Sequence, residues 1–224
     1  MADPNSKLMI VYAGPSGSGK STRYRADRQA DPYLASLPMC SPDEFIEQVA
    51  REHGYDQAIS VPPEQMSSIL IEAIRLFRQK RDELFAAGKS FVYESSACSR
   101  RIIRILDQAY KLGYFVDIRY YVLMSGELTL ERIKERVNRG GLGMPPEDLL
   151  RNYKRAMALL PKVLARSDKA RVYDNSGAEP VNLILSNGRG RSISFGPSTT
   201  FTRGEMRKYV SKMLFERALL YPEN

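Results

Sequence analysis

A short glycine-rich segment near the N-terminus has the residue types and spacing of a phosphate-binding loop. Residues 14–21 read Gly-Pro-Ser-Gly-Ser-Gly-Lys-Ser and fit the pattern G-x-x-x-x-G-K-[ST]. Glycines let backbone N–H groups converge on phosphate oxygens, while Lys20 can reach the β- and γ-phosphates and the Ser21 hydroxyl can bind Mg²⁺. The segment therefore predicts a nucleoside triphosphate site with Mg²⁺. The expected contacts are Gly14, Pro15, Ser16, Gly17, Ser18, Gly19, Lys20, Ser21 and Thr22.

The residues on either side of this loop supply the context that the motif requires. Lys7–Ala13 contains a run of five apolar residues and predicts a buried strand, and a helix is expected to begin near Gly19. A chance match within a Gly/Ser-rich turn is the alternative, and the strand–loop–helix order argues against it. The motif alone does not separate kinases from GTPases and ATPases.

Features missing from the sequence narrow the class. No N-K-x-D element follows the loop, so a Ras-like GTPase is not expected. Helicases and transport ATPases usually have an apolar strand ending in Asp-Glu, whereas Phe91–Tyr93 is followed by Glu94 and two serines. These observations favour a small-molecule or nucleoside kinase. Such an enzyme also needs a base for the acceptor hydroxyl, cations for the γ-phosphate and an acceptor pocket.

Asp43 is the candidate for the base. It lies in the segment Ser41-Pro42-Asp43-Glu44, which predicts a helix start with Ser41 as the cap and Glu44 closing a capping box. A carboxylate beside the phosphate site can accept the proton of an acceptor hydroxyl. The alternative is that Asp43 only interacts favourably with the helix dipole.

Glu94 is a second candidate, because it directly follows the predicted strand Ser90–Tyr93. Open α/β sheets bind ligands at the carboxyl ends of their strands. The alternative is an ordinary surface acid at a strand end. Arginines then flank the Gly/Pro loop 140–145 and could close over a triphosphate, although some are expected to be solvated helix-surface residues. They are Arg132, Arg136, Arg139, Arg151 and Arg155.

The remaining pattern predicts strands that alternate with amphipathic helices. We expect an α/β, P-loop NTPase-type three-layer fold with a mainly parallel sheet, plus a C-terminal hairpin and helix. Asn187-Gly188 is a hairpin signal, and Thr202 with Glu205 predicts the start of the last helix. The expected organisation is one domain, 1–224, with a motif-bearing core at about 7–176 and an extension at 177–224.

The composition indicates a globular protein with anionic partners. The 34 Lys and Arg residues exceed the 26 Asp and Glu residues, so the net charge is +8. The longest Lys/Arg run is two residues, which makes nucleic acid an unlikely partner. The apolar runs are too short for a membrane span, and two cysteines with one histidine exclude a Cys/His zinc cage and a disulfide scaffold. The expected compartment is the cytoplasm.

The ordered set of motifs resembles the zeta toxins, the kinase components of epsilon/zeta toxin–antitoxin systems. Gly14–Thr22 is similar to their phosphate loop, and Cys40–Phe45 to their Asn-Pro-Asp segment. Phe91–Ser96 resembles their Glu-Thr-Thr strand end. The lid and closing strand of that family are matched, in order, by Glu135–Val137, Gly140–Gly141, Pro145, Arg151–Tyr153 and Val172–Ser176.

This resemblance implies an ATP-dependent phosphotransferase, with the 3′-hydroxyl of UDP-N-acetylglucosamine as the best-known acceptor and an antitoxin as a possible partner. It implies that Asp43 is the base and that Glu94 contacts the acceptor, with Ser95 and Ser96 beside it. It also implies that two cations, Arg136 and Arg151, offset charge on the transferred phosphoryl group. The sequence departs from the family at Leu142, where His usually follows the diglycine, and in the serines after Glu94.

Overall fold

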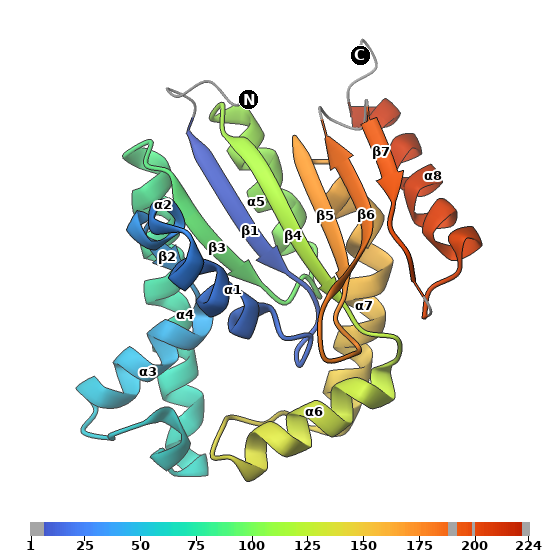
Figure 1. The fold of residues 1–224 in the computed structure, drawn as a ribbon. Coiled ribbons are helices and arrows are strands. Elements are labelled where there is room, and N and C mark those ends of the chain that lie inside the picture. Colours follow the sequence, from blue (N-terminus) through green and yellow to red (C-terminus); the bar gives the residue numbers. More distant parts are fainter. Residues whose placement is uncertain (1–6, 188–191, 199, 221–224) are drawn as a thin grey trace.

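One mixed sheet forms the centre of the molecule (Figure 1). The computed structural model describes residues 7–187, 192–198 and 200–220. Its strands are β1 (Leu8–Ala13), β2 (Met39–Cys40), β3 (Phe91–Ser95), β4 (Phe115–Val122), β5 (Lys169–Asp174), β6 (Val181–Asn187) and β7 (Ser192–Phe195). Within these residues the strand order is β2-β3-β1-β4-β5-β6-β7. The strands from β2 to β5 pair in parallel, whereas β6 and β7 are antiparallel.

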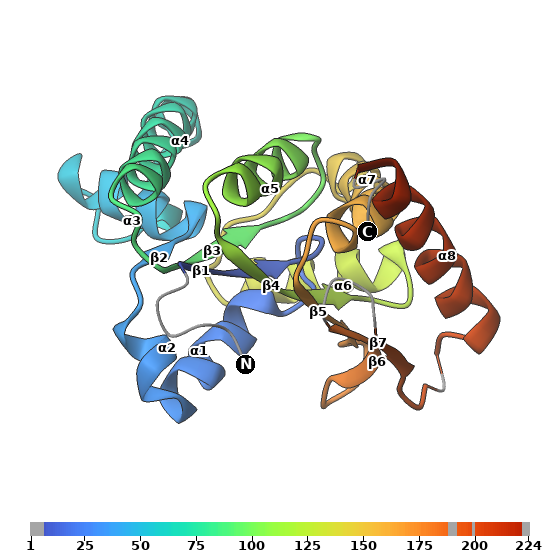
Figure 2. The ribbon, with the colours of Figure 1, turned by 90° about the horizontal axis from the view of Figure 1, so that it is seen from above.

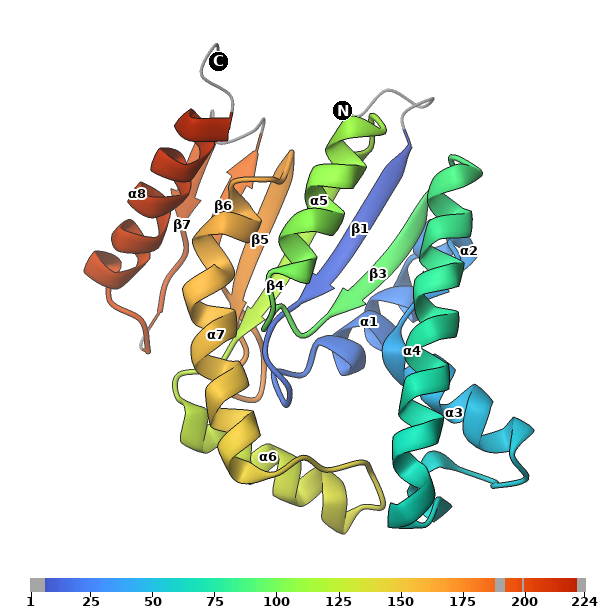
Figure 3. The same cartoon turned by 180° about the vertical axis from the view of Figure 1, so that it is seen from behind.

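Helices cover both faces of the sheet and give three layers. They are α1 (Lys20–Ala30), α2 (Pro32–Ser36), α3 (Pro42–Glu52), α4 (Pro63–Ala86), α5 (Arg101–Lys111), α6 (Gly126–Asn138), α7 (Pro146–Leu164) and α8 (Arg203–Leu220), with a 3₁₀ turn at Ala58–Ser60. Helices α4, α5, α7 and α8 lie on one face, and α1 and α2 on the other (Figures 2 and 3). This is the three-layer arrangement predicted for P-loop NTPases.

The apolar run of β1 is explained by its central position. Met9 and Val11 pack in the main core below α4, α5 and α7, while Ile10 and Tyr12 pack on the opposite face with Tyr24 of α1. A parallel strand buried on both faces requires apolar side chains at successive positions. The carboxyl ends of β1 and β3 point toward α3 and α6, which extend beyond that edge of the sheet (Figure 1).

The C-terminal segment completes the same sheet and core. Leu183 and Ile184 of β6 and Met206 and Met213 of α8 belong to the main apolar cluster. The predicted strands on both sides of Asn187 are confirmed, although residues 188–191, which include Gly188, lie outside the described residues. None of the described helices is long and apolar enough to cross a lipid bilayer.

Polar side chains set the starts of three helices. Helix α2 begins after Asp31, whose carboxylate accepts hydrogen bonds from the backbone N–H groups of Tyr33 and Leu34, at 3.0 and 3.2 Å. Helix α6 begins at Gly126, where the Ser125 hydroxyl accepts the N–H of Leu128. At α8 the predicted capping box is confirmed, with Thr202 N–H donating to Glu205 at 2.8 Å.

Candidate functional site

The phosphate-loop sequence joins the end of β1 to the start of α1, as predicted. Gly14 N–H donates to Ser95 O at 3.2 Å, which ties the loop to the end of β3. Gly14 and Gly19 have φ values of +139° and +81°. A Cβ would lie 2.1 Å from Tyr121 O at Gly14, and 2.3 Å from Asn175 Nδ2 at Gly19. Gly14 therefore requires glycine both for conformation and for space, because the clash is with backbone, whereas Gly19 requires glycine for its conformation.

The start of α1 is suited to an anion. No side chain in the described part of the chain caps this helix, and its first turn has no acidic residue. Its first N–H groups therefore remain available, and the helix dipole favours negative charge there. The Ser18 hydroxyl is fully buried and has no hydrogen-bond partner among the described residues, so the loop contains a polar atom that a ligand could satisfy.

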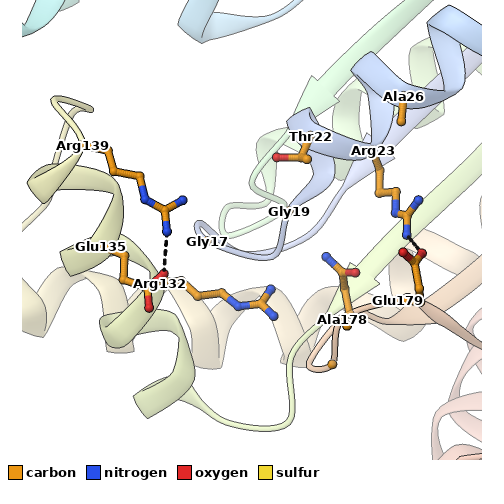
Figure 4. Close-up of a pocket in the computed structure, with 12 residues that line it drawn as sticks. Gly17, Gly19, Thr22, Arg23, Ala26, Arg132, Glu135, Arg139, Ala178 and Glu179 are labelled. Carbon is orange, nitrogen blue, oxygen red and sulfur yellow. Dashed lines mark hydrogen bonds and ion pairs between the residues drawn. The ribbon is translucent and has the colours of Figure 1, made fainter.

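A pocket of about 490 Å³ opens beside this loop (Figure 4). The Arg132 side chain extends from α6 toward Ala178, below the loop residues Gly17 and Gly19 (Figure 4). The volume lies within the range of small-molecule sites. The lining residues come from the loop, α1, α6 and the β5–β6 connection: Gly17, Gly19, Thr22, Arg23, Ala26, Arg132, Glu135, Arg139, Asn175, Gly177, Ala178 and Glu179.

Polar contacts hold the walls of this pocket in place. Arg132 Nη2 donates to Ser176 O at 3.1 Å, and Asn175 Nδ2 donates to Ser18 O at 2.8 Å. Arg23 on α1 pairs with Glu179 after β5, at 2.5 Å. Arg132 is among the arginines that the sequence predicts at the site, whereas Arg23 and Glu179 are not. The likeness of Val172–Ser176 to a closing strand is the signal that covers Asn175 and Ser176.

Glu94 lies at the end of β3, directly beside the phosphate loop. It is 5% exposed, and each carboxylate oxygen accepts one hydroxyl. Ser21 Oγ donates to Oε1 and Ser41 Oγ donates to Oε2, both at 2.6 Å. Lys20 Nζ lies 3.9 Å from Oε1. The predicted Mg²⁺ ligand Ser21 and the predicted phosphate contact Lys20 are therefore both adjacent to this carboxylate.

This arrangement fits a bound Mg²⁺. The cation prefers oxygen ligands and usually takes one or two protein groups, with phosphate oxygens and waters completing its octahedron. The Ser21 hydroxyl would be the direct ligand, and the Glu94 carboxylate would hold that hydroxyl in place.

The predicted capping box at α3 is wrong. Ser41 occupies the cap position of α3, but its side chain makes no cap hydrogen bond and instead donates to Glu94. Glu44, the predicted second half of the box, lies near the same carboxylate, since burial and then the negative charge of Glu94 raise the pKa of Glu44. The Ser41 hydroxyl thus donates to a distant carboxylate and does not accept a local N–H group.

Asp43 faces a different neighbour. Arg136 Nη2 lies 3.5 Å from Asp43 Oδ2, and this pair joins the first turn of α3 to the last turn of α6. Both side chains are substantially exposed, at 52% for Asp43 and 44% for Arg136. The structure therefore brings together the predicted base and one of the predicted phosphoryl-binding arginines.

Other predicted site residues do not converge on these groups. Arg151 pairs with Asp148 on its own helix, α7. The Ser95 hydroxyl accepts Ala97 N–H at 3.1 Å, and the Ser96 hydroxyl lies 3.1 Å from Cys98 Sγ. The Gly14–Ser95 bond places Ser95 beside the phosphate loop, and both hydroxyls are engaged within their own turn.

The glycine-rich loop after α6 packs against two elements. A Cβ at Gly141 would lie 2.5 Å from Arg136 Cγ, so glycine leaves room for that side chain. Leu142, the departure from the family pattern, packs against the apolar cluster formed by α3 and α4, which includes Ile46 and Ile69. The loop thus connects the arginine-bearing helix to the helices on the other side of the site.

Comparisons with known proteins support the fold. Two matching structures are of the AvrRxo1-ORF1:-ORF2 complex. The native complex has a TM-score of 0.59 at 17% identity over 93% of this chain, which spans 65% of that chain. The complex with ATP has a TM-score of 0.57 at 17% identity, over 99% of this chain and 77% of that one.

A third structure comes from the PezAT chromosomal toxin–antitoxin system of the human pathogen Streptococcus pneumoniae. It has a TM-score of 0.52 at 15% identity, over 96% of this chain and 88% of that one. No protein-family model matches the sequence, and no curated protein matches it. At these identities the comparisons show a shared fold, and one of the matched folds belongs to a toxin–antitoxin system, as the resemblance to zeta toxins implies.

Proposed function

We propose that this protein is an ATP-dependent kinase that transfers the γ-phosphate to a hydroxyl of a nucleotide-linked small molecule. The observation that carries the proposal is the phosphate loop at the end of β1, in which Gly14 leaves no room for a Cβ and Ser21 donates to Glu94. The Asp43–Arg136 pair on α3 and α6 adds groups suited to transfer.

The nucleotide half of the site follows from the loop and the adjoining pocket. The loop N–H groups and Lys20 bind the phosphates, and the Ser21 hydroxyl would be a ligand of Mg²⁺. When bound, Mg²⁺ neutralises charge on the β- and γ-phosphate oxygens. The pocket between Arg132 and the loop at Asn175–Glu179 has the volume for the base and ribose. A shared fold with the AvrRxo1-ORF1:-ORF2 complex solved with ATP supports this choice of nucleotide.

Transfer of the phosphoryl group depends on the exposed ion pair between Asp43 and Arg136. Asp43 accepts the proton of the acceptor hydroxyl, and Arg136 interacts with charge on the transferred phosphoryl group. Arg151 interacts with the same phosphoryl charge once its side chain has moved away from Asp148, with which it is paired in this structure. UDP-N-acetylglucosamine is the acceptor that the family resemblance suggests. An antitoxin protein is the proposed macromolecular partner, and the cytoplasm is the proposed compartment.

Calorimetry with ATP and Mg²⁺ tests the nucleotide half. Lys20→Ala should weaken binding at least about tenfold, since a charge-assisted contact to phosphate is lost. Lys208→Ala, an exposed lysine on α8, is the charge-matched control and should bind like wild type. Absence of Mg·ATP binding to wild type at millimolar concentration contradicts the proposal.

Mass spectrometry tests the transfer half. A metabolite extract is incubated with enzyme and ATP, and products with one added phosphate are sought. Wild type should produce such a species and Lys20→Ala should not. A phosphorylated nucleotide sugar supports the zeta-toxin-like acceptor, whereas a phosphorylated nucleoside or polynucleotide end identifies a different kinase. A wild-type protein that binds Mg·ATP but phosphorylates nothing is a nucleotide-binding module.

A further inference from the structure

Glu94 lies where three segments of the site meet. Its strand, β3, is between β2 and β1, with Tyr93 paired to Cys40 and Glu94 paired to Tyr12. The loop after β1 carries Ser21 toward it, and the turn after β2 carries Ser41 toward it. One carboxylate therefore contacts both the phosphate loop and the first turn of α3.

The contacts of this carboxylate account for its burial. A buried charge is stable only when it is paired and hydrogen-bonded. Each oxygen of Glu94 accepts one hydroxyl at 2.6 Å, the range of a charge-assisted bond, and Lys20 Nζ lies 3.9 Å away. The bond from Ser41 is thus part of what stabilises the charge beside the Mg²⁺ serine.

Ser41 makes this bond and makes no cap hydrogen bond to its own helix. At the cap position of α3 its hydroxyl would ordinarily accept a backbone N–H of the first turn, and here it donates to Glu94. The first turn of α3, which holds Asp43, is therefore oriented from Glu94 rather than by its own cap.

We propose that Glu94 couples the Mg²⁺ serine of the phosphate loop to α3, and that Ser41 is the positioning residue that transmits this coupling to Asp43. This inference rests on the proposed function and revises the acceptor contact that the resemblance implied for Glu94. Ser21 can bind a cation through an oxygen lone pair while its proton still donates to Glu94. Nucleotide binding at the loop thereby acts on the helix that carries the base.

The first test measures how ATP affinity depends on Mg²⁺. Carboxylates that orient a metal ligand are worth about 10–100-fold in metal affinity. Glu94→Gln should therefore weaken ATP binding by about that factor in the presence of Mg²⁺, and change it little in EDTA. An unchanged Mg²⁺ dependence in Glu94→Gln overturns the proposal and returns Glu94 to the role of acceptor contact.

The second test follows hydrogen exchange in α3, with and without Mg·ATP. In wild type, Mg·ATP should slow exchange across residues 43–52. In Ser41→Ala this response should disappear while Mg·ATP affinity stays within about threefold of wild type, and Ser41→Thr, which keeps the hydroxyl, should restore it. A purely structural role would change exchange in α3 equally with and without the nucleotide, so an Ala variant that retains the Mg·ATP response overturns the proposal.

Ser125→Ala supplies the matched control, because Ser125 does cap its own helix. It should speed exchange at the start of α6 while leaving the Mg·ATP response of α3 intact. Loss of the α3 response in this control as well makes the effect nonspecific and overturns the coupling. If wild type itself binds no Mg·ATP, it is the proposed function that fails, which calorimetry detects before any variant is made.

Discussion

The site has a phosphate end, formed by the phosphate loop and Glu94, and an acceptor end, formed by Asp43 and Arg136. The two ends differ in how their side chains are held. At the phosphate end, the side chains of Lys20 and Glu94 are only 12% and 6% exposed, and Gly14 has backbone where a Cβ would be. At the acceptor end, Asp43 and Arg136 are joined by one exposed ion pair at 3.5 Å. Exposed pairs of this kind contribute about 0–1 kcal/mol.

The phosphate end is therefore preorganised, whereas the side chains of the acceptor end can be rearranged when a ligand binds. Buried, fully bonded groups keep one geometry, which suits a triphosphate whose shape does not vary. A weak surface pair can open for an acceptor at little cost and then contact the reacting groups. Changes at the acceptor end are therefore expected to lower the rate of transfer without weakening nucleotide binding, whereas changes at the phosphate end should affect nucleotide binding and folding.

Among changes at the acceptor end, Arg136→Ala should give the largest effect on transfer. Arginines that meet the charge of a phosphoryl-transfer transition state are worth about 10³–10⁵ in rate. We expect kcat to fall by that order, with little change in ATP affinity, because the phosphates are held by the loop and Lys20. Steady-state kinetics with the acceptor and calorimetry with ATP measure the two quantities.

Arg104→Ala is the charge-matched control for this change, since Arg104 is exposed on α5. It should retain wild-type turnover. Similar losses of kcat in both variants would show that net positive charge, rather than the position of Arg136, determines the rate.

Asp43→Asn should give the next largest effect. The amide keeps the shape of the side chain and removes the proton acceptor, so transfer should fall by about 10²–10⁴. ATP affinity should stay near wild type, and the loss of a favourable helix-dipole interaction should cost only about 0.3–1 kcal/mol in unfolding free energy. A variant with near-normal kcat and a slightly lower melting temperature would make Asp43 a helix-start residue, and Glu94 would become the candidate base.

Gly14→Ala tests the rigidity of the phosphate end, with Gly113→Ala as its matched control. Both glycines have positive φ, but a Cβ at Gly113 meets no atom within 4 Å. The control should lose about 1–2 kcal/mol from backbone conformation alone. Gly14→Ala should lose about 2–5 kcal/mol, since steric overlap with Tyr121 O adds about 1–3 kcal/mol. Denaturant unfolding measures both losses. Equal shifts of the midpoint in Gly14→Ala and Gly113→Ala would show that the phosphate loop adjusts freely and is no more rigid than the acceptor end.

The sequence predicts the phosphate end well because its signals are local. The strand, glycines, lysine and helix start of Lys7–Thr22 are contiguous, so their spacing carries the geometry. The wall formed by Arg23, Asn175 and Glu179 is assembled from segments about 150 residues apart, and only the completed sheet brings them together.

Ser41 shows how a local signal can mislead. The pattern Ser-Pro-Asp-Glu favours a capping box, and the sequence correctly predicts that a helix begins there. The Ser41 hydroxyl donates to Glu94, a buried carboxylate that requires hydrogen-bond donors, and makes no cap bond at its own helix. A partner that is 53 residues away cannot be predicted from local spacing.

The pairing of the arginines around the site changes how a charged ligand enters. Four of them are already matched with carboxylates: Arg23 with Glu179, Arg136 with Asp43, Arg139 with Glu135 and Arg151 with Asp148. A phosphorylated ligand that contacts any of these four arginines must therefore displace the acid that the arginine is paired with. Fewer bound counterions are released in such an exchange, so affinity should depend less steeply on salt than the number of arginines suggests. The excess positive charge of the chain is thus kept from attracting polyanions of any shape into the site.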